Sequence, residues 1–179
     1  MLTHPSAAFV FLVSVCAVAF CQSGSAETPL EKFKSAEQSK GCESIPYDSL
    51  RRKCTDTTVD IGEYCKEGKR SCKEVKRARS DPATKDDPQA TKELAEGNRR
   101  ELELRRGWNE KCRDGRALIR DIFSDAVTQG KNESDSEIKP LAQKLVPYWE
   151  QGQKDHQQAR DDAQAAADLC RDRLNSRDF

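Results

Sequence analysis

The chain has 179 residues, of which 35% are charged and 35% hydrophobic, and its 31 lysines and arginines balance its 31 aspartates and glutamates. A net charge of zero excludes nucleic-acid binding driven by overall charge, because phosphate-binding proteins carry an excess of basic residues. The aromatic content of 6% leaves little material for a large core, and the eight cysteines exceed what ordinary packing explains. The length allows one domain, or one domain with an ordered tail.

An apolar run of fourteen residues, Ala7–Phe20, lies close to the start of the chain, and Ser14 is its only polar member. This pattern is typical of the apolar region of a signal peptide, and it is shorter than the roughly 20 residues of a membrane-spanning helix. Small residues at Gly24 and Ala26 favour cleavage after Ala26. We therefore expect residues 1–26 to be a signal peptide and the remainder to be secreted or periplasmic, with no transmembrane span.

Cys21 directly follows the apolar run and opens an alternative, in which this cysteine is acylated and the product is a lipid-anchored envelope protein. Phe20 argues against this alternative, because such processing needs a small side chain at that position. Both interpretations place the mature protein outside the cytoplasm.

Six cysteines remain after cleavage, and an even number in an exported chain predicts three disulfides. Bonds worth about 2–4 kcal/mol each would compensate for the small core. The spacing leaves fifteen possible pairings open. A metal site is disfavoured, because the chain has no CxxC pair and a single histidine, His156, after cleavage, so neither a metal nor a cofactor is expected. The six are Cys42, Cys54, Cys65, Cys72, Cys112 and Cys170.

The N-terminal half of the mature chain divides into two segments. Residues 27–41 are polar and are expected to form a loosely held arm. Residues 42–79 are expected to form a cysteine-rich helical module. Within it, Pro46 suits an early helical position, and apolar residues at spacings of three and four predict a short helix over 44–54. A second short helix is expected over 59–65.

Gly68 should end that second helix, and residues 80–89, rich in proline and aspartate, are expected to be a linker. Asp87 followed by Pro88 is a favourable helix start, because the carboxylate caps free amides and proline loses no hydrogen bond at the first helical position. We expect a long helix from there to about Thr128. Its apolar stripe would comprise Leu94, Gly97, Leu104, Trp108, Cys112, Gly115, Leu118, Ile119, Ile122 and Ala126.

Ser134 and Glu137 match a capping box and predict the start of a second long helix, which runs to about Asn175. Pro147 inside it predicts a break or kink. Apolar and small residues repeat by sevens in two rows, which indicates a helix-pairing seam of the coiled-coil type. The rows are Ile138, Leu145, Gly152, Ala159 and Ala166, and Ala142, Trp149, His156, Ala163 and Cys170.

Two long helices joined by about six residues should fold back antiparallel. Cys112 lies about 20 residues before the turn and Cys170 about 38 after it, a mismatch of roughly 27 Å along the axis, so these two cannot bond each other across a straight hairpin. Each should instead bond to the 42–72 region. The predicted fold class is all-α: disulfide-stapled short helices followed by a long antiparallel helical hairpin or small bundle over residues 90–179.

His156, flanked by Asp155 and followed by Asp161, is the candidate for catalytic chemistry. A histidine oriented by a carboxylate could serve as a general base, or as one ligand of a weak metal site, in a small exported hydrolase or metal-dependent enzyme. Its place in the seam, between Trp149 and Ala163, favours a packing role instead. The non-enzymatic interpretation is therefore preferred.

Residues 66–79 hold seven cations against two acids, a local excess of +5 in a neutral chain. Such a basic segment predicts contact with a protein or an anionic polymer, although a solvated face balanced by acids elsewhere is the plainer alternative. No aromatic residue is interleaved, which argues against specific nucleic-acid recognition. We expect an exported, non-enzymatic protein that acts through macromolecular contact. The cations are Lys66, Lys69, Arg70, Lys73, Lys76, Arg77 and Arg79.

Asn132 begins an Asn-Glu-Ser sequon in the turn expected between the long helices. This sequence is a glycosylation acceptor only in a eukaryotic secretory pathway. Short sequons also arise by chance, so the motif predicts a possible modification site and no more.

Overall fold

The computed structural model describes residues 27–68, 72–75, 81–84 and 86–176. These residues form helices joined by turns, and no strand occurs among them, which confirms the all-α fold class. Four α-helices and two short 3₁₀ segments follow one another along the described chain. They are α1 (Pro29–Glu37), η1 (Gly41–Ser44), α2 (Asp48–Gly68), η2 (Cys72–Glu74), α3 (Pro88–Lys131) and α4 (Lys139–Asn175).

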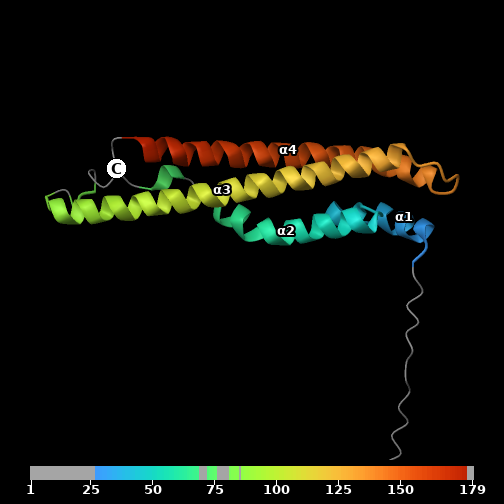
Figure 1. Cartoon of the computed structure of the whole chain (residues 1–179), viewed down its shortest axis with the longest axis horizontal. Coiled ribbons are helices and arrows are strands. Elements are labelled where there is room, and N and C mark those ends of the chain that lie inside the picture. Colours follow the sequence, from blue (N-terminus) through green and yellow to red (C-terminus); the bar gives the residue numbers. More distant parts are fainter. Residues whose placement is uncertain (1–26, 69–71, 76–80, 85, 177–179) are drawn as a thin grey trace, which may run out of the picture.

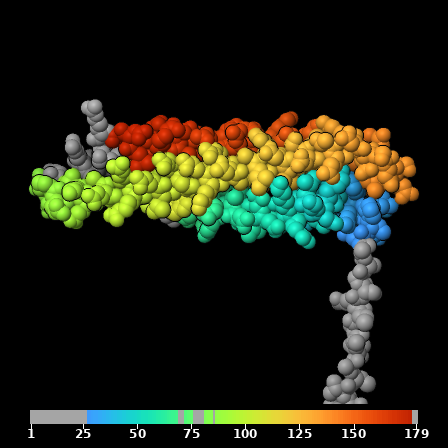
Figure 2. Space-filling view, viewed as in Figure 1, coloured from blue at the N-terminus to red at the C-terminus, as the bar shows by residue number. Residues whose placement is uncertain are grey.

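The two long helices form the expected antiparallel hairpin, and the shorter helices lie along one side of it (Figure 1). α2 runs beside the half of α3 that is closer to the α3–α4 turn, and α1 packs against α4 at the turn end. The first half of α3 extends beyond the end of α2 (Figures 1 and 2). The molecule is therefore a rod that is three helices thick at the turn end and thinner at the other.

The start of α3 follows the prediction from the sequence. Asp87 is its N-cap, and the carboxylate accepts hydrogen bonds from the backbone N–H groups of Gln89 and Ala90, with Pro88 as the first helical residue. The helix continues to Lys131, three residues beyond the expected end at Thr128.

The start of α4 differs from the prediction. Asp135, not Ser134, accepts hydrogen bonds through its side chain from the backbone N–H groups of Glu137 and Ile138, and the helix begins at Lys139. The capping box is therefore absent, because a turn built around Asp135 satisfies the amides first. Of the break or kink expected at Pro147, the break is absent, because α4 is continuous through this residue. Packing on the rest of the bundle outweighs the one backbone hydrogen bond that proline removes.

The N-terminal half is more ordered than expected. Residues 27–41 were expected to form a loosely held arm, but most of them form α1, with Thr28 and Glu31 as a reciprocal capping box and Phe33 buried against the bundle. The two short helices expected over 44–54 and 59–65 are one helix, α2, which ends at Gly68 as predicted. Pro46 lies before this helix instead of inside its first turn.

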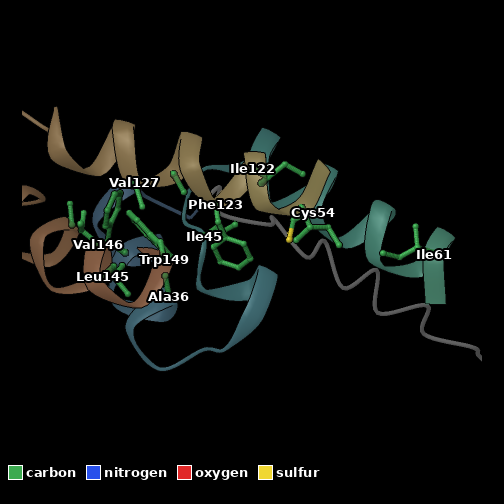
Figure 3. Close-up of a cluster of buried hydrophobic side chains, with 14 residues drawn as sticks. Ala36, Ile45, Cys54, Ile61, Ile122, Phe123, Val127, Leu145, Val146 and Trp149 are labelled. Carbon is green, nitrogen blue, oxygen red and sulfur yellow. The ribbon is translucent and has the colours of Figure 1, made fainter. Parts of the chain in front are cut away.

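Buried side chains form two separate clusters. The larger, which we call the turn-end core, joins α1, η1, α2 and both long helices around Trp149, whose indole N–H donates to the carbonyl of Ser44 over 2.9 Å (Figure 3). The smaller, which we call the disulfide-end core, lies near the start of α3 and the end of α4. Its buried members are Cys72, Val75, Leu102 and Cys170.

The buried stripe of α3 is rotated in its first half relative to the prediction. Leu104 and Trp108 were placed inward, but Leu104 is 54% exposed and Trp108 is only partly buried. Leu102 and Asn109 occupy the buried side instead, at 0% and 4% exposure. Leu118 is also exposed, at 37%, whereas Ile119 and Ile122 are buried as expected. α2 packs on a different side of α3, where Gly115 meets Ile61 and Cys112 bonds to Cys65, so it does not cover these outward residues.

Three disulfides connect these elements: Cys42–Cys54, Cys65–Cys112 and Cys72–Cys170. Each cysteine of the hairpin is bonded to the cysteine-rich module, as the mismatch in axial position predicts, and two cysteines of the module bond each other. The bonds tie α2 to η1, α2 to α3, and η2 to α4.

Candidate functional site

His156 lies on the side of α4 that faces α3 and is half-buried. Its ring stacks on the Phe123 ring, with centroids 5.6 Å apart, and its Nδ1 lies 3.3 Å from Nη1 of Arg116. Burial lowers the pKa of His156 below 6.5; the positive charge of Arg116 lowers it further, and Asp155 opposes the shift. The environment therefore favours the neutral ring.

The two carboxylates expected beside His156 have other partners. Asp155 accepts a hydrogen bond from Nε2 of Gln151 over 2.7 Å, and Asp161 accepts from Gln157 over 2.8 Å. Both are exposed, and among the described residues neither is hydrogen-bonded to His156. The catalytic grouping considered from the sequence is thus not assembled in this arrangement, and the hydrogen-bonding partner of the ring is Arg116.

No cluster of metal ligands occurs in the described part of the chain. There, no three side chains of histidine, cysteine, aspartate or glutamate come together in a way that could hold a metal ion. The six cysteines named above are all used in disulfides.

Most of the basic segment falls outside the described residues. Lys69, Arg70, Lys76, Arg77 and Arg79 belong to this part. Two of its members are described. Lys66 lies in the last turn of α2, with a side chain that is 73% exposed and 4.0 Å from the carboxylate of Glu63. Lys73 lies in η2, next to the cysteine that anchors this segment to α4.

A second surface was missed by the sequence analysis. On the side of α3 that α2 leaves uncovered, a shallow depression combines exposed Leu104 and half-buried Trp108 with charged neighbours. Nζ of Lys111 lies 4.5 Å from the centre of the Tyr64 ring, so this surface adjoins the end of α2. We call it the α3 face. It comprises Arg100, Glu103, Leu104, Gly107, Trp108 and Lys111.

Asn132 is exposed at the turn between the long helices, where it is the C-cap residue of α3. Its backbone N–H donates to the last carbonyls of the helix, including those of Thr128 and Gln129. The sequon is therefore accessible at the tip of the hairpin.

Comparison of the chain with protein-family models, with curated proteins and with solved structures finds no match. Among the described helices, none combines the length and the apolar composition needed to cross a membrane. Residues 1–26, which include the expected signal peptide and Cys21, lie outside the described residues. The functional argument therefore depends on the surfaces of the bundle itself.

Proposed function

We propose that this chain is an exported, disulfide-stabilised helical protein that binds an acidic macromolecule through the basic segment 66–79 and the adjoining α3 face. Export is supported by the apolar run Ala7–Phe20, followed by small residues. It is also supported by three disulfides, because such bonds form and persist in oxidising compartments.

The observation that carries the binding proposal is the concentration of charge. A chain with no net charge places seven cations and two acids in residues 66–79. Lys66 extends from the end of α2, where Tyr64 adjoins Lys111 and hence the α3 face. On the α3 face, Arg100 and Lys111 line the same depression as exposed Leu104 and half-buried Trp108, and they offer a partner both charge attraction and apolar area.

The test is capture of partners from the native compartment by the tagged chain at about 50 and 200 mM salt, followed by identification of what is bound. Screening shortens the reach of exposed charges to about 8 Å at physiological salt, so capture should fall steeply between the two conditions. A variant in which five cations are reversed should lose most of the captured material. The reversed residues are Lys69→Glu, Arg70→Glu, Lys73→Glu, Lys76→Glu and Arg77→Glu.

A matched variant controls for net charge, because it changes the total charge by the same amount at the turn end of the rod. It should retain capture. Leu104→Asp should weaken capture even at low salt, because it removes apolar contact area. The proposal fails if the captured partners and their salt dependence are the same in all variants. The control reverses the exposed residues Lys34, Lys40, Arg52, Lys53 and Lys139 to glutamate.

A further inference from the structure

A cavity of about 420 Å³ lies between α3, α4 and the end of α2. It occupies the gap between the two cores: along α3 it begins after Leu102 and ends before Ile119. Its size falls in the range of about 300–1,000 Å³ that is typical of small-molecule sites. The rod therefore has a hollow where its two clusters of large side chains fail to meet.

The hollow exists because α4 presents small side chains to it. Ala159, Ala163 and Ala166 line one wall, and the Cys65–Cys112 disulfide lines the facing wall. Larger residues at these positions of α4 would fill the space, as Trp149 does in the turn-end core. The middle of the cavity is thus apolar and offers no group that needs a hydrogen bond.

One end of the cavity carries a positive charge. Arg116 lines it, half-buried, and its guanidinium contacts Nδ1 of His156. Arg113 and Arg120, on the same helix, each pair with the aspartate that follows them, whereas Arg116 forms no ion pair with any residue that the structure describes. The lowered pKa of His156 favours its neutral ring, so this neighbour does not neutralise the charge of Arg116. The guanidinium is therefore available to an anion.

The other end carries a buried amide. Asn109 is 4% exposed, and its Nδ2 donates to the carbonyl of Arg105 over 2.9 Å. Its Oδ1 lies against Gly68 of α2, where a Cβ added to the glycine would come within 2.6 Å of it, and the side chain lines the cavity. Asn109 therefore closes this end of the cavity with a side chain that packs against α2 and is hydrogen-bonded along its own helix. Along α3, Asn109 and Arg116 are separated by about 10 Å at the helical rise of 1.5 Å per residue.

The remaining charged group of the lining is Asp162, which lies at the rim. It is exposed, and its carboxylate accepts a hydrogen bond from Nε2 of Gln158 over 2.8 Å. Its charge is therefore solvated and hydrogen-bonded to a neighbour on its own helix, and among the described residues it forms no ion pair with Arg116.

We propose that this cavity binds a medium-chain carboxylate, with the carboxylate on Arg116 and the hydrocarbon chain along the alanines of α4. An arginine matches a carboxylate in a bidentate geometry, which no neutral group reproduces. The alanine wall gives the hydrocarbon chain its apolar contact, and Asn109 closes the far end of the cavity. This inference is independent of the macromolecular contact proposed above, which uses the outer surface.

The test is titration of the oxidised full chain with decanoate and with decanol, by displacement of anilinonaphthalene sulfonate. Decanoate should bind at one site per chain, and decanol about tenfold more weakly, because it cannot pair with the guanidinium. Arg116→Gln should weaken decanoate about tenfold and leave decanol unchanged. Arg120→Gln is the matched control, because Arg120 lies outside the cavity and already pairs with Asp121, and it should change neither.

A second pair of variants tests the hydrocarbon path. Ala166→Leu fills the cavity and should abolish binding of both compounds, whereas Ala165→Leu adds the same atoms on the exposed side of α4 and should have no effect. Circular dichroism verifies that each variant is folded. The proposal is overturned if decanoate shows no saturable binding, if Arg116→Gln weakens both compounds equally, or if folded Ala166→Leu binds decanoate as the wild type does.

Discussion

The turn-end core and the disulfide-end core hold the same two helices together in different ways. At the turn end, Trp149 and Phe123 are almost completely buried, and α1, η1 and α2 cover the hairpin. At the other end, Leu102 is the one large apolar side chain among the described residues that is fully buried, and it shares a cluster with the Cys72–Cys170 bond.

This difference shows how a chain with few large apolar residues stabilises a long rod. Burial of large side chains supplies most of the free energy where such residues exist. Where α4 presents alanines, the Cys72–Cys170 disulfide holds η2 in place. Arg173 adds to this, because its guanidinium donates hydrogen bonds to the carbonyls of Cys72 and Val75. The two ends should therefore respond differently to loss of a bond and to loss of a side chain.

The largest expected effect is the removal of the Cys72–Cys170 bond. Replacing both cysteines by alanine should cost about 4.7 kcal/mol, against about 2.8 kcal/mol for Cys42 and Cys54, because the bonds join residues 98 and 12 positions apart. Urea unfolding of both double variants without reductant measures the difference. Equal losses would mean that side chains, not the bond, hold the disulfide end.

Loss of the central aromatic residue ranks next. Trp149→Ala should lower the free energy of unfolding by about 3–5 kcal/mol, because it empties a fully buried site and leaves the carbonyl of Ser44 without its donor. Leu102→Ala should cost about 2–3 kcal/mol, since a small cluster relaxes more easily. Val59→Ala is the control: its side chain is 73% exposed, so the change should stay within about 0.5 kcal/mol.

These costs are measured by guanidinium titration followed by circular dichroism. The proposed difference between the two cores is contradicted if Leu102→Ala lowers the free energy of unfolding as much as Trp149→Ala does. That result would make the disulfide-end core an equal source of stability.

Two glycine-to-alanine changes in α3 should alter the free energy of unfolding in opposite directions, depending on whether α2 packs on the glycine. Gly115→Ala should destabilise by about 1–3 kcal/mol, because the added Cβ would overlap the Ile61 side chain of α2. Gly97→Ala should stabilise by about 0.5–1 kcal/mol, because it lies in open space and alanine restricts the unfolded chain. Thermal scans should therefore move in opposite directions. Two shifts of the same sign would contradict the close contact of α2 on α3.

The smallest effect is a pH dependence at the junction between the regions. The pKa of His156 is below 6.5 in the folded chain, so the unfolded chain binds its proton first as the pH falls. The contribution of His156 to stability is therefore present above about pH 6.5 and is lost below it. Urea midpoints of the wild type should decline from pH 7 to pH 5 more than those of His156→Gln. A steeper decline in the variant would contradict the direction of the shift.

The sequence predicted the features that depend on local chemistry and on simple geometry. Asp87 and Pro88 start α3 as expected, because a cap is decided by residues within one turn. The rise of a helix predicted that Cys112 and Cys170 bond to the module and not to each other, since they lie too far apart along the hairpin to meet, but it did not choose their partners. In the candidate site, His156, for which the sequence favoured a packing role, stacks on Phe123.

The errors arose where a choice depended on a distant partner. Leu102 and Leu104 lie about 80° to either side of Cys112 around the helix, so periodicity alone cannot decide which one faces inward. The η2 segment and α4 decide it, by packing Val75 and Cys170 on the Leu102 side. Likewise Arg116, the cation beside His156, is forty residues away in sequence and carried no signal of its own.

The sequence by itself determined that this protein is helical, that its long helices pair, and that its cysteines bond between the hairpin and the module preceding it, because periodicity, capping and axial distance are local properties. Only the tertiary structure decided which side of α3 is buried, that residues 29–37 join the bundle as a helix, and that a cavity remains between the two cores. The reason is that burial depends on what lies opposite each residue, and the partners come from segments far apart in the chain.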